Sequence, residues 1–181
     1  MPGRTQARNK GAAGTTGRRF AITRGPVQIR FGAGASEDIL RDLEAVGAER
    51  VLLVCSPGRQ ADGAAFAARL GARSAGVLAI AREHVPAEVV SAGDREVART
   101  GADAVLALGG GSAIGLAKAL ALRAPLRIIA VPTTYSGSKM TPIYGITEAG
   151  EKRTGRDERA RPALVVYDPR LTLGLPRDVI V

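Results

Sequence analysis

Short, largely apolar runs alternate with amphipathic stretches along most of this chain. The apolar runs lie at Val51–Cys55, Gly76–Ile80, Ala104–Leu108 and Arg127–Val131. Apolar strands that alternate with helices are typical of a parallel sheet with helices packed on both of its faces. The pattern therefore predicts a Rossmann-like, doubly wound α/β fold.

The amphipathic stretches carry start and stop signals for helices. Ser36 offers the hydroxyl of an N-cap, which predicts a helix through Val46 that ends at Gly47. Three further helices are expected, at Asp62–Leu70, Pro86–Arg99 and Ala113–Leu122. Each of these helices falls between two of the apolar runs or directly after one, as the doubly wound fold requires.

The two ends of this alternating body differ from it. Phe20–Phe31 is predicted to be extended. Ile143–Thr147 and Ala163–Tyr167 are predicted to form an appended β-hairpin around the charged turn Gly150–Arg161. The first 19 residues are rich in Gly, Thr and Arg and show no apolar periodicity, so we expect a disordered basic tail there.

The composition is that of a folded globular chain, and it changes how the charge is interpreted. Of the 181 residues, 45% are hydrophobic and 3% aromatic, and the formal net charge is +9. Seven basic residues precede the first acid, Glu37, and the rest of the chain carries only +2. Because no aromatic platform accompanies these charges, we do not expect a nucleic-acid partner.

Two further features of the sequence bear on the location and redox setting of the protein: the length of its apolar runs and the number of its cysteines. No apolar run approaches the roughly 20 residues of a membrane span, so no membrane partner is expected. Cys55 is the single cysteine, which excludes an intramolecular disulfide and a metal site built from several thiolates. We therefore expect a cytoplasmic protein.

The clearest chemical signal is Gly109-Gly110-Gly111-Ser112, which follows an apolar run and leads into a predicted helix. The glycines let the backbone approach a ligand closely, and the N–H groups at the start of the helix favour an anion. The motif is neither a dinucleotide fingerprint nor a P-loop, because Lys118 lies too far along the helix. A glycine-rich turn that only permits tight packing is the alternative.

A second polar loop, Pro132–Ser138, follows the next apolar run. Its hydroxyl groups suit ribose or pyrophosphate oxygens, and an ordinary polar turn is the alternative. Because neighbouring parallel strands end at the same edge of a sheet, we expect the two loops to form one ligand site.

Longer stretches resemble maleylacetate reductases, which belong to the iron-containing (group III) alcohol dehydrogenase superfamily. These stretches are VLALGGGSAIGLAKALAL, VPTTYSGSKMTPIYGITEAGEKRTGRD and VVYDPRLTLGLP, with FGAGA and VLLVCSPGR in agreement. The resemblance runs from roughly Val27 onward, and TPIYGITE with GEKRTGRD is its most specific part. It implies reduction of maleylacetate, or substituted maleylacetates, to 3-oxoadipate by NADH or NADPH in the degradation of aromatic compounds.

The resemblance also implies a domain plan. Family members have an N-terminal nucleotide-binding domain followed by a helical domain, and their full-length chains are expected to form homodimers. On that pattern, residues 20–175 would be the NAD(P)-binding domain and residues 176–181 would begin the helical domain. The metal ligands of metal-dependent relatives, an Asp and later His residues, would lie beyond Val181, so we expect no metal site in this sequence.

The resemblance assigns cofactor contacts but no catalytic residue. The pyrophosphate would lie on Gly109, Gly110, Gly111 and Ser112. Thr133 and Thr134 would also contact the cofactor, and Lys152 would lie near the nicotinamide ribose. Tyr135 and Lys139 lie nearby in sequence without an assigned role.

The cofactor preference is approached from the residues after Val51–Cys55. A carboxylate there would bind the adenine ribose 2′-hydroxyl and repel a 2′-phosphate. The sequence has Ser56-Pro57-Gly58-Arg59 instead. We therefore expect NADPH to be tolerated, with Ser56 or Arg59 near the 2′ position.

One residue departs from the family pattern, and the single histidine is considered beside it. Lys139 occupies a position where the family carries Glu, which reverses the local charge beside a cofactor loop. His84, the only histidine, lies between a predicted strand and helix, and a structural or solvated role is expected for it.

Three alternatives remain open. The first is a metal-dependent alcohol dehydrogenase of the same superfamily, which would reduce aldehydes or ketones. The second is a non-catalytic module that binds NAD(P)H without turnover. The third, a nucleic-acid binder acting through the basic tail, would show a steep salt dependence.

Overall fold

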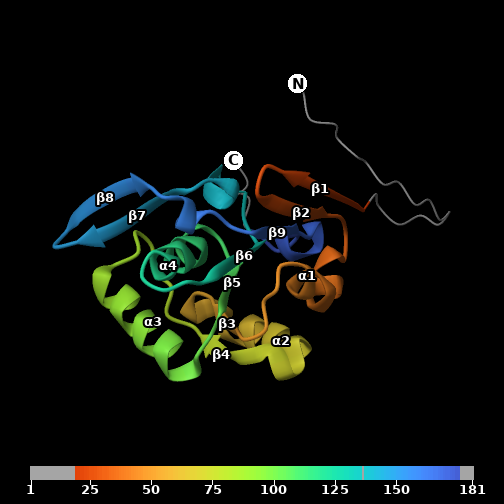
Figure 1. Ribbon diagram of the computed structural model, residues 1–181, viewed down its shortest axis with the longest axis horizontal. Coiled ribbons are helices and arrows are strands. Elements are labelled where there is room, and N and C mark those ends of the chain that lie inside the picture. Colours follow the sequence, from red (N-terminus) through yellow and green to blue (C-terminus); the bar gives the residue numbers. More distant parts are fainter. Residues whose placement is uncertain (1–18, 136, 176–181) are drawn as a thin grey trace.

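A computed structural model describes residues 19–135 and 137–175 of the chain. The predicted tail, apart from Arg19, and the predicted start of a helical domain at 176–181 lie outside these residues. Within them, seven strands form one sheet in the order β1-β2-β9-β6-β5-β3-β4, and β7 and β8 form a separate hairpin. Figure 1 shows that hairpin at one end of the molecule and β1 and β2 at the other.

The elements follow one another in the alternating order that the sequence predicts. Two strands open the described chain, and single helices then alternate with strands as far as β6. The strands are β1 (Phe20–Arg24), β2 (Val27–Phe31), β3 (Val51–Val54), β4 (Ser74–Leu78), β5 (Ala104–Gly109), β6 (Arg127–Pro132), β7 (Ile143–Glu148), β8 (Glu151–Arg156) and β9 (Leu164–Tyr167). The α-helices are α1 (Ile39–Ala45), α2 (Gln60–Leu70), α3 (Ala87–Thr100) and α4 (Gly111–Ala121).

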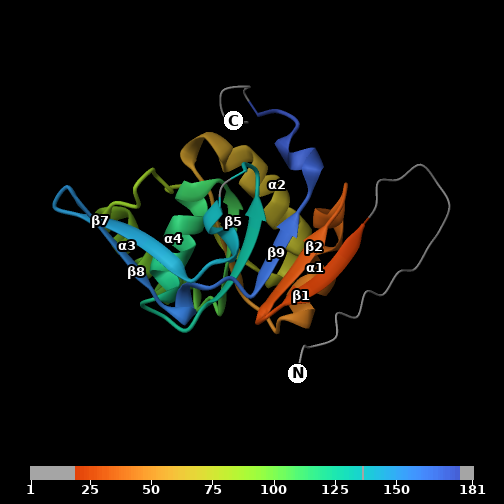
Figure 2. The ribbon, with the colours of Figure 1, turned by 90° about the horizontal axis from the view of Figure 1, so that it is seen from above.

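Helices cover both faces of the sheet, which confirms the Rossmann-like α/β fold. Figure 2 shows the strands between α3 and α4 on one side and α1 and α2 on the other. All six residues of β5 are buried, and alternate residues enter opposite cores: Val105 packs with α3 and α4, whereas Leu106 packs with α1 and α2. The apolar runs are therefore strands that are buried on both faces.

The predicted hairpin between Ile143–Thr147 and Ala163–Tyr167 is wrong in its second strand. β7 pairs instead with β8, which lies inside the segment predicted to be a charged turn. β9 enters the main sheet, parallel to β2 on one side and β6 on the other. The physical reason is burial: β9 is apolar and needs both faces covered, whereas β8 is largely exposed and therefore polar.

Two local predictions at the N-terminal side are also corrected. Phe20–Phe31 is not one extended segment, because β1 and β2 form an antiparallel pair that turns at Gly25 with φ 61°. Ser36 does not cap α1, which begins three residues later at Ile39. Its hydroxyl instead donates to the carboxylate of Asp168 at 2.8 Å, which joins the first helical turn to the end of β9.

In the part of the chain that the structure describes, no helix is both long enough and apolar enough to cross a membrane.

Candidate functional site

The candidate site lies where β5 ends and α4 begins. Gly109 has a φ of 151°, a conformation that favours glycine. α4 starts at Gly111, and its N-cap is Gly110, which has no side chain with which to cap the first turn. The first N–H groups of an α-helix have no partner within the helix, so this end of α4 presents donors and a positive dipole end to a ligand.

Gly110 and Gly111 have different roles: one allows close packing of a loop, and the other leaves space for a ligand. A Cβ atom on Gly110 would lie 2.8 Å from the Thr134 hydroxyl oxygen, so this glycine lets the loop after β6 pack closely. A Cβ atom on Gly111 would meet nothing within 4 Å. Gly110 therefore fits the packing interpretation, whereas Gly111 borders open space at the helix N-terminus.

Thr133 carries a buried hydroxyl group without a partner. Its backbone N–H donates to the carbonyl oxygen of Gly109 at 3.1 Å, which fixes the ends of β6 and β5 together. The residue is 1% exposed, and within the described residues its Oγ1 has no hydrogen-bond partner. Buried polar groups are rarely left unpaired, so an orphaned hydroxyl beside a helix N-terminus indicates a place where a bound molecule supplies the partner.

Two hollows adjoin at the start of α4. The first, of about 380 Å³, contains seven of the eight predicted cofactor residues: Ser56, Gly109, Gly110, Gly111, Ser112, Thr133 and Thr134. The second, of about 570 Å³, contains the eighth, Lys152. Glu83, Gly111 and Ser112 border both hollows, so one extended ligand lying across the N-terminus of α4 would reach all eight residues.

The β7–β8 hairpin forms one wall of the second hollow, and Lys118 fastens it to α4. The Lys118 ammonium group donates to the carbonyl oxygens of Thr141 at 2.8 Å and Ile143 at 2.6 Å. Burial, together with the charge of Arg161, lowers the pKa of Lys118 to about 8. Lys118 is thus no phosphate ligand, in line with its place inside the helix, but it holds the strand that precedes Lys152.

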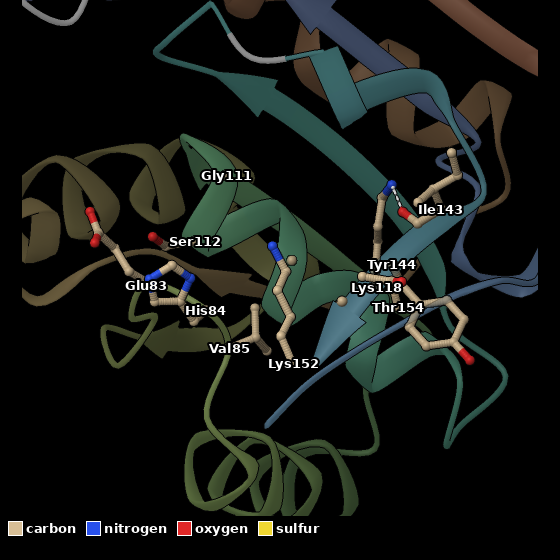
Figure 3. A pocket seen from close by; sticks show the side chains of 12 residues that line it. Glu83, His84, Val85, Gly111, Ser112, Lys118, Ile143, Tyr144, Lys152 and Thr154 are labelled. Carbon is tan, nitrogen blue, oxygen red and sulfur yellow. Dashed lines mark hydrogen bonds between the residues drawn. The ribbon is translucent and has the colours of Figure 1, made fainter. Parts of the chain in front are cut away.

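Lys152 reaches the hollow across a glycine. A Cβ atom on Gly145 of β7 would lie 3.2 Å from the Cε atom of Lys152 on β8. The missing side chain therefore gives room to the aliphatic stem of Lys152. Figure 3 shows this side chain extending along the hollow, with its ammonium group directed toward the N-terminal turn of α4.

Sequence reasoning missed a turn that borders the second hollow. Glu83 and His84 line it together with Tyr144 and Thr154. His84 was expected to have a structural or solvated role, and it is indeed exposed, but its exposed ring lies at the candidate site. The lack of a motif around His84 explains why the sequence alone did not place it there.

Lys139 lies under the second polar loop. It is 3% exposed, its ammonium group donates to the carbonyl oxygen of Thr134, and it lies 5.7 Å from the centre of the Tyr167 ring. Burial lowers the pKa of Lys139 to about 8. The positive charge of Lys139, which replaces the Glu of the family pattern, therefore interacts with a backbone carbonyl group and with the face of an aromatic ring.

Tyr135 lies on the outer side of the same loop. It is 66% exposed, and its hydroxyl is 3.0 Å from that of Thr172. It also borders the first hollow.

Ser56 and Arg59 close the far side of the first hollow. Arg59 forms an ion pair of 3.1 Å with Asp62. A third hollow, of about 340 Å³, continues from the first, since Arg59 and Thr133 border both. This side of the site therefore offers an arginine whose charge is partly balanced.

The family that the sequence resembles includes metal-dependent enzymes. Among residues 19–135 and 137–175, no three His, Cys, Asp or Glu side chains gather in a group that could hold a metal ion. The described residues therefore do not fit a metal site.

A family model and a curated relative both match most of this chain. The family model described as iron-containing alcohol dehydrogenase matches residues 26–169. Maleylacetate reductase of Burkholderia cepacia is 49% identical over 149 residues, which cover 82% of this chain and 42% of that protein. The chain thus spans less than half the length of this curated relative.

Solved structures show the same likeness in three dimensions. Maleylacetate reductase from Agrobacterium tumefaciens has a TM-score of 0.84 at 43% identity, covering 87% of this chain and 45% of that one. Sulfoacetaldehyde reductase from Bifidobacterium kashiwanohense, solved in complex with NAD+, has a TM-score of 0.78 at 25% identity, covering 85% and 47%.

Proposed function

Because the chain belongs to the iron-containing alcohol dehydrogenase family, we propose that it is the NAD(P)H-binding part of an oxidoreductase that reduces maleylacetate to 3-oxoadipate. The observation that carries the nucleotide is the uncapped start of α4, with open space at Gly111 and the orphaned hydroxyl of Thr133 beside it. The substrate is proposed from the likeness to maleylacetate reductases, at 49% identity in one case.

The residues around α4 fit a dinucleotide. The N–H groups of Gly111 and Ser112 would hold the pyrophosphate, because the helix dipole stabilises negative charge there. The Thr133 hydroxyl donates to one of its oxygens or to the ribose, which satisfies the orphaned group. The two hollows on either side of Ser112 then take the two nucleoside halves, the adenosine beside Ser56 and the nicotinamide beside Lys152.

The cofactor and the chain would contribute different parts of the reaction. When bound, the reduced nicotinamide would supply the hydride for one carbon of the substrate's double bond, and with a proton on the other carbon this would give 3-oxoadipate and oxidised cofactor. The chain binds the pyrophosphate, orients the nicotinamide half through Lys152, and holds the loops in place through Lys118. Orientation of this kind contributes to catalysis by placing the reacting carbons within reach.

Domain roles, assembly and location form part of the same proposal. Residues 20–175 act as the NAD(P)-binding domain of a homodimeric, cytoplasmic enzyme with a small anionic substrate. Cys55 is buried and forms no disulfide, which is in keeping with a reducing compartment.

The experiment follows NADH fluorescence and absorbance with the purified chain. We expect saturable binding of NADH that weakens in Ser112→Ala, and oxidation of NADH when maleylacetate is added without metal. Oxidation with an aldehyde and Fe²⁺, but not with maleylacetate, would favour the metal-dependent alternative. Binding without turnover of either substrate would favour the non-catalytic nucleotide-binding alternative for this chain.

A further inference from the structure

The turn at Glu83–Val85 has an unusual backbone. His84 has a φ of 61° and Val85 a φ of 49°. Both values lie in the left-handed region, which residues other than glycine seldom adopt and which a β-branched side chain tolerates least. Such a conformation persists only where the surrounding structure enforces it, and it is often found at functional sites.

The β7–β8 hairpin enforces this turn. Thr147 donates from its hydroxyl to the carbonyl oxygen of His84 at 2.7 Å and from its backbone N–H to that of Val85 at 3.1 Å. The Val85 side chain is buried against α4, where a Cβ atom on Gly115 would come within 2.6 Å of it. The turn is therefore held from two sides while the ring of His84 stays exposed.

The result is an imidazole at the edge of the second hollow. Figure 3 shows the His84 ring between Glu83 and Val85, with Ser112 and the Lys152 ammonium group above the same hollow. The backbone of Lys152 is paired with β7, whereas its ammonium group has no hydrogen bond or ion pair within the described residues, and Gly145 leaves room for its stem. Both side chains can therefore turn toward a ligand.

The charges of this hollow favour an anion. Among the described residues that line it, Glu83 is the one acidic side chain, against Lys118, Lys152 and the positive end of the α4 dipole. Lys118 is committed to the carbonyl oxygens of Thr141 and Ile143. Of the nitrogen donors that line the hollow, the Lys152 ammonium and the His84 imidazole are thus left to bind a ligand, and both donate hydrogen bonds to carboxylates.

We propose that His84 and Lys152 form a subsite for a carboxylate group of the substrate, beside the nicotinamide half of the cofactor. The inference rests on the proposed function, because it takes the second hollow as the nicotinamide end and a dicarboxylate as the substrate. The strained turn then has a purpose: it fixes the imidazole where the substrate carboxylate is bound next to the reacting carbons.

The single histidine of the chain makes the test direct. The imidazole C–H signals in a proton NMR spectrum all belong to His84, so we titrate the chain with maleate at saturating NADH. We expect a saturable shift of these signals, and no shift with the uncharged diamide of maleic acid. Lys152→Met should weaken maleate binding at least tenfold, whereas Arg153→Met, the next residue on β8, should change it less than twofold.

A second variant separates the imidazole from the turn. His84→Asn keeps a residue that tolerates the left-handed region, so thermal unfolding should match that of the unaltered chain. Calorimetry should show maleate affinity at least fivefold weaker, with NADH affinity within twofold of the original.

The outcomes separate the two proposals. NADH binding with unmoved His84 signals, or equal shifts with the diamide, would overturn the carboxylate subsite and leave the cofactor site intact. Failure of the unaltered chain to bind NADH would overturn the proposed function and the subsite with it.

Discussion

The ammonium group of Lys118 lies 2.6 Å from the carbonyl oxygen of Ile143, which ties the helix at the centre of the site to the first residue of β7. One helix thus has two tasks. Its N-terminus presents donors to a ligand, and its middle holds the hairpin that carries Lys152. The position of Lys152 therefore depends on a side chain that borders the hollow but is itself committed to backbone carbonyls.

Replacing this lysine tests that dependence. Lys118→Met keeps most of the side-chain length but removes the donor from two carbonyl oxygens, so we expect the free energy of unfolding to fall by about 1–3 kcal/mol. NADH affinity should fall severalfold because the hairpin is less firmly held. Urea unfolding and fluorescence titration measure the two effects, and an unchanged NADH dissociation constant would show that the hairpin does not position the site.

The two buried lysines predict a rise in stability at alkaline pH. Burial lowers the pKa of Lys139 from its ordinary 10.5 to about 8. Between these values the unfolded chain binds more protons than the folded chain, so the free energy of unfolding increases as pH rises from about 8 to 10.5. Each unit of difference corresponds to about 1.4 kcal/mol.

Lys139→Met isolates this contribution. The variant should lack part of the rise, with Lys118 supplying the remainder. Urea unfolding at pH 7, 8, 9 and 10 measures it, and parallel curves for the two proteins would contradict the assignment.

Thr133 predicts opposite effects on stability and on binding. Thr133→Val keeps the shape of the side chain and removes the orphaned hydroxyl. The free chain should become more stable by about 1 kcal/mol, because no buried polar group is left unpaired. NADH binding should weaken about fivefold to tenfold, since the ligand loses that hydroxyl. A loss of stability together with unchanged binding would show that the hydroxyl has a structural partner instead.

Arg59 predicts the choice between the two cofactors. Arg59→Met should weaken NADPH binding by about threefold to tenfold, because a 2′-phosphate loses a charged donor that Asp62 already balances in part. NADH binding should stay within twofold. Arg95 on α3 provides the control, because it is exposed and borders none of the three hollows, so Arg95→Met removes the same charge elsewhere. Equal losses for both cofactors in Arg59→Met would count against a role at the 2′ position.

Much of the fold could be predicted because burial leaves a clear trace in the sequence. β3, β5 and β6 are buried strands, and their apolar runs predict the parallel sheet. β8 could not be found in this way, because EKRTGR is exposed and as polar as a loop. The place of β9 between β2 and β6 depends on long-range pairing that no local pattern encodes.

The candidate site could likewise be predicted only in part. The glycines before α4 and the threonines after β6 form contiguous motifs, and the structure brings them together with Ser56 at one hollow. His84 lies in a turn whose conformation depends on Thr147, 63 residues away. For Ser36 the local pattern was misleading. Its hydroxyl suggested a helix N-cap but donates instead to Asp168, which lies 132 residues later in the chain.

Gly111 offers the most direct measurement of the central claim, that a dinucleotide lies across the N-terminus of α4. A Cβ atom at this position would meet nothing within 4 Å apart from its own stretch of chain, so we expect Gly111→Val to fold as the unaltered chain does while its methyl groups occupy the ligand's space. Gly174→Val, at another open glycine, serves as the matched control. We predict that NADH fluorescence titration shows saturable binding for the unaltered chain and for Gly174→Val, and at least tenfold weaker binding for Gly111→Val. Unchanged binding in Gly111→Val, with its fold intact, would contradict the account.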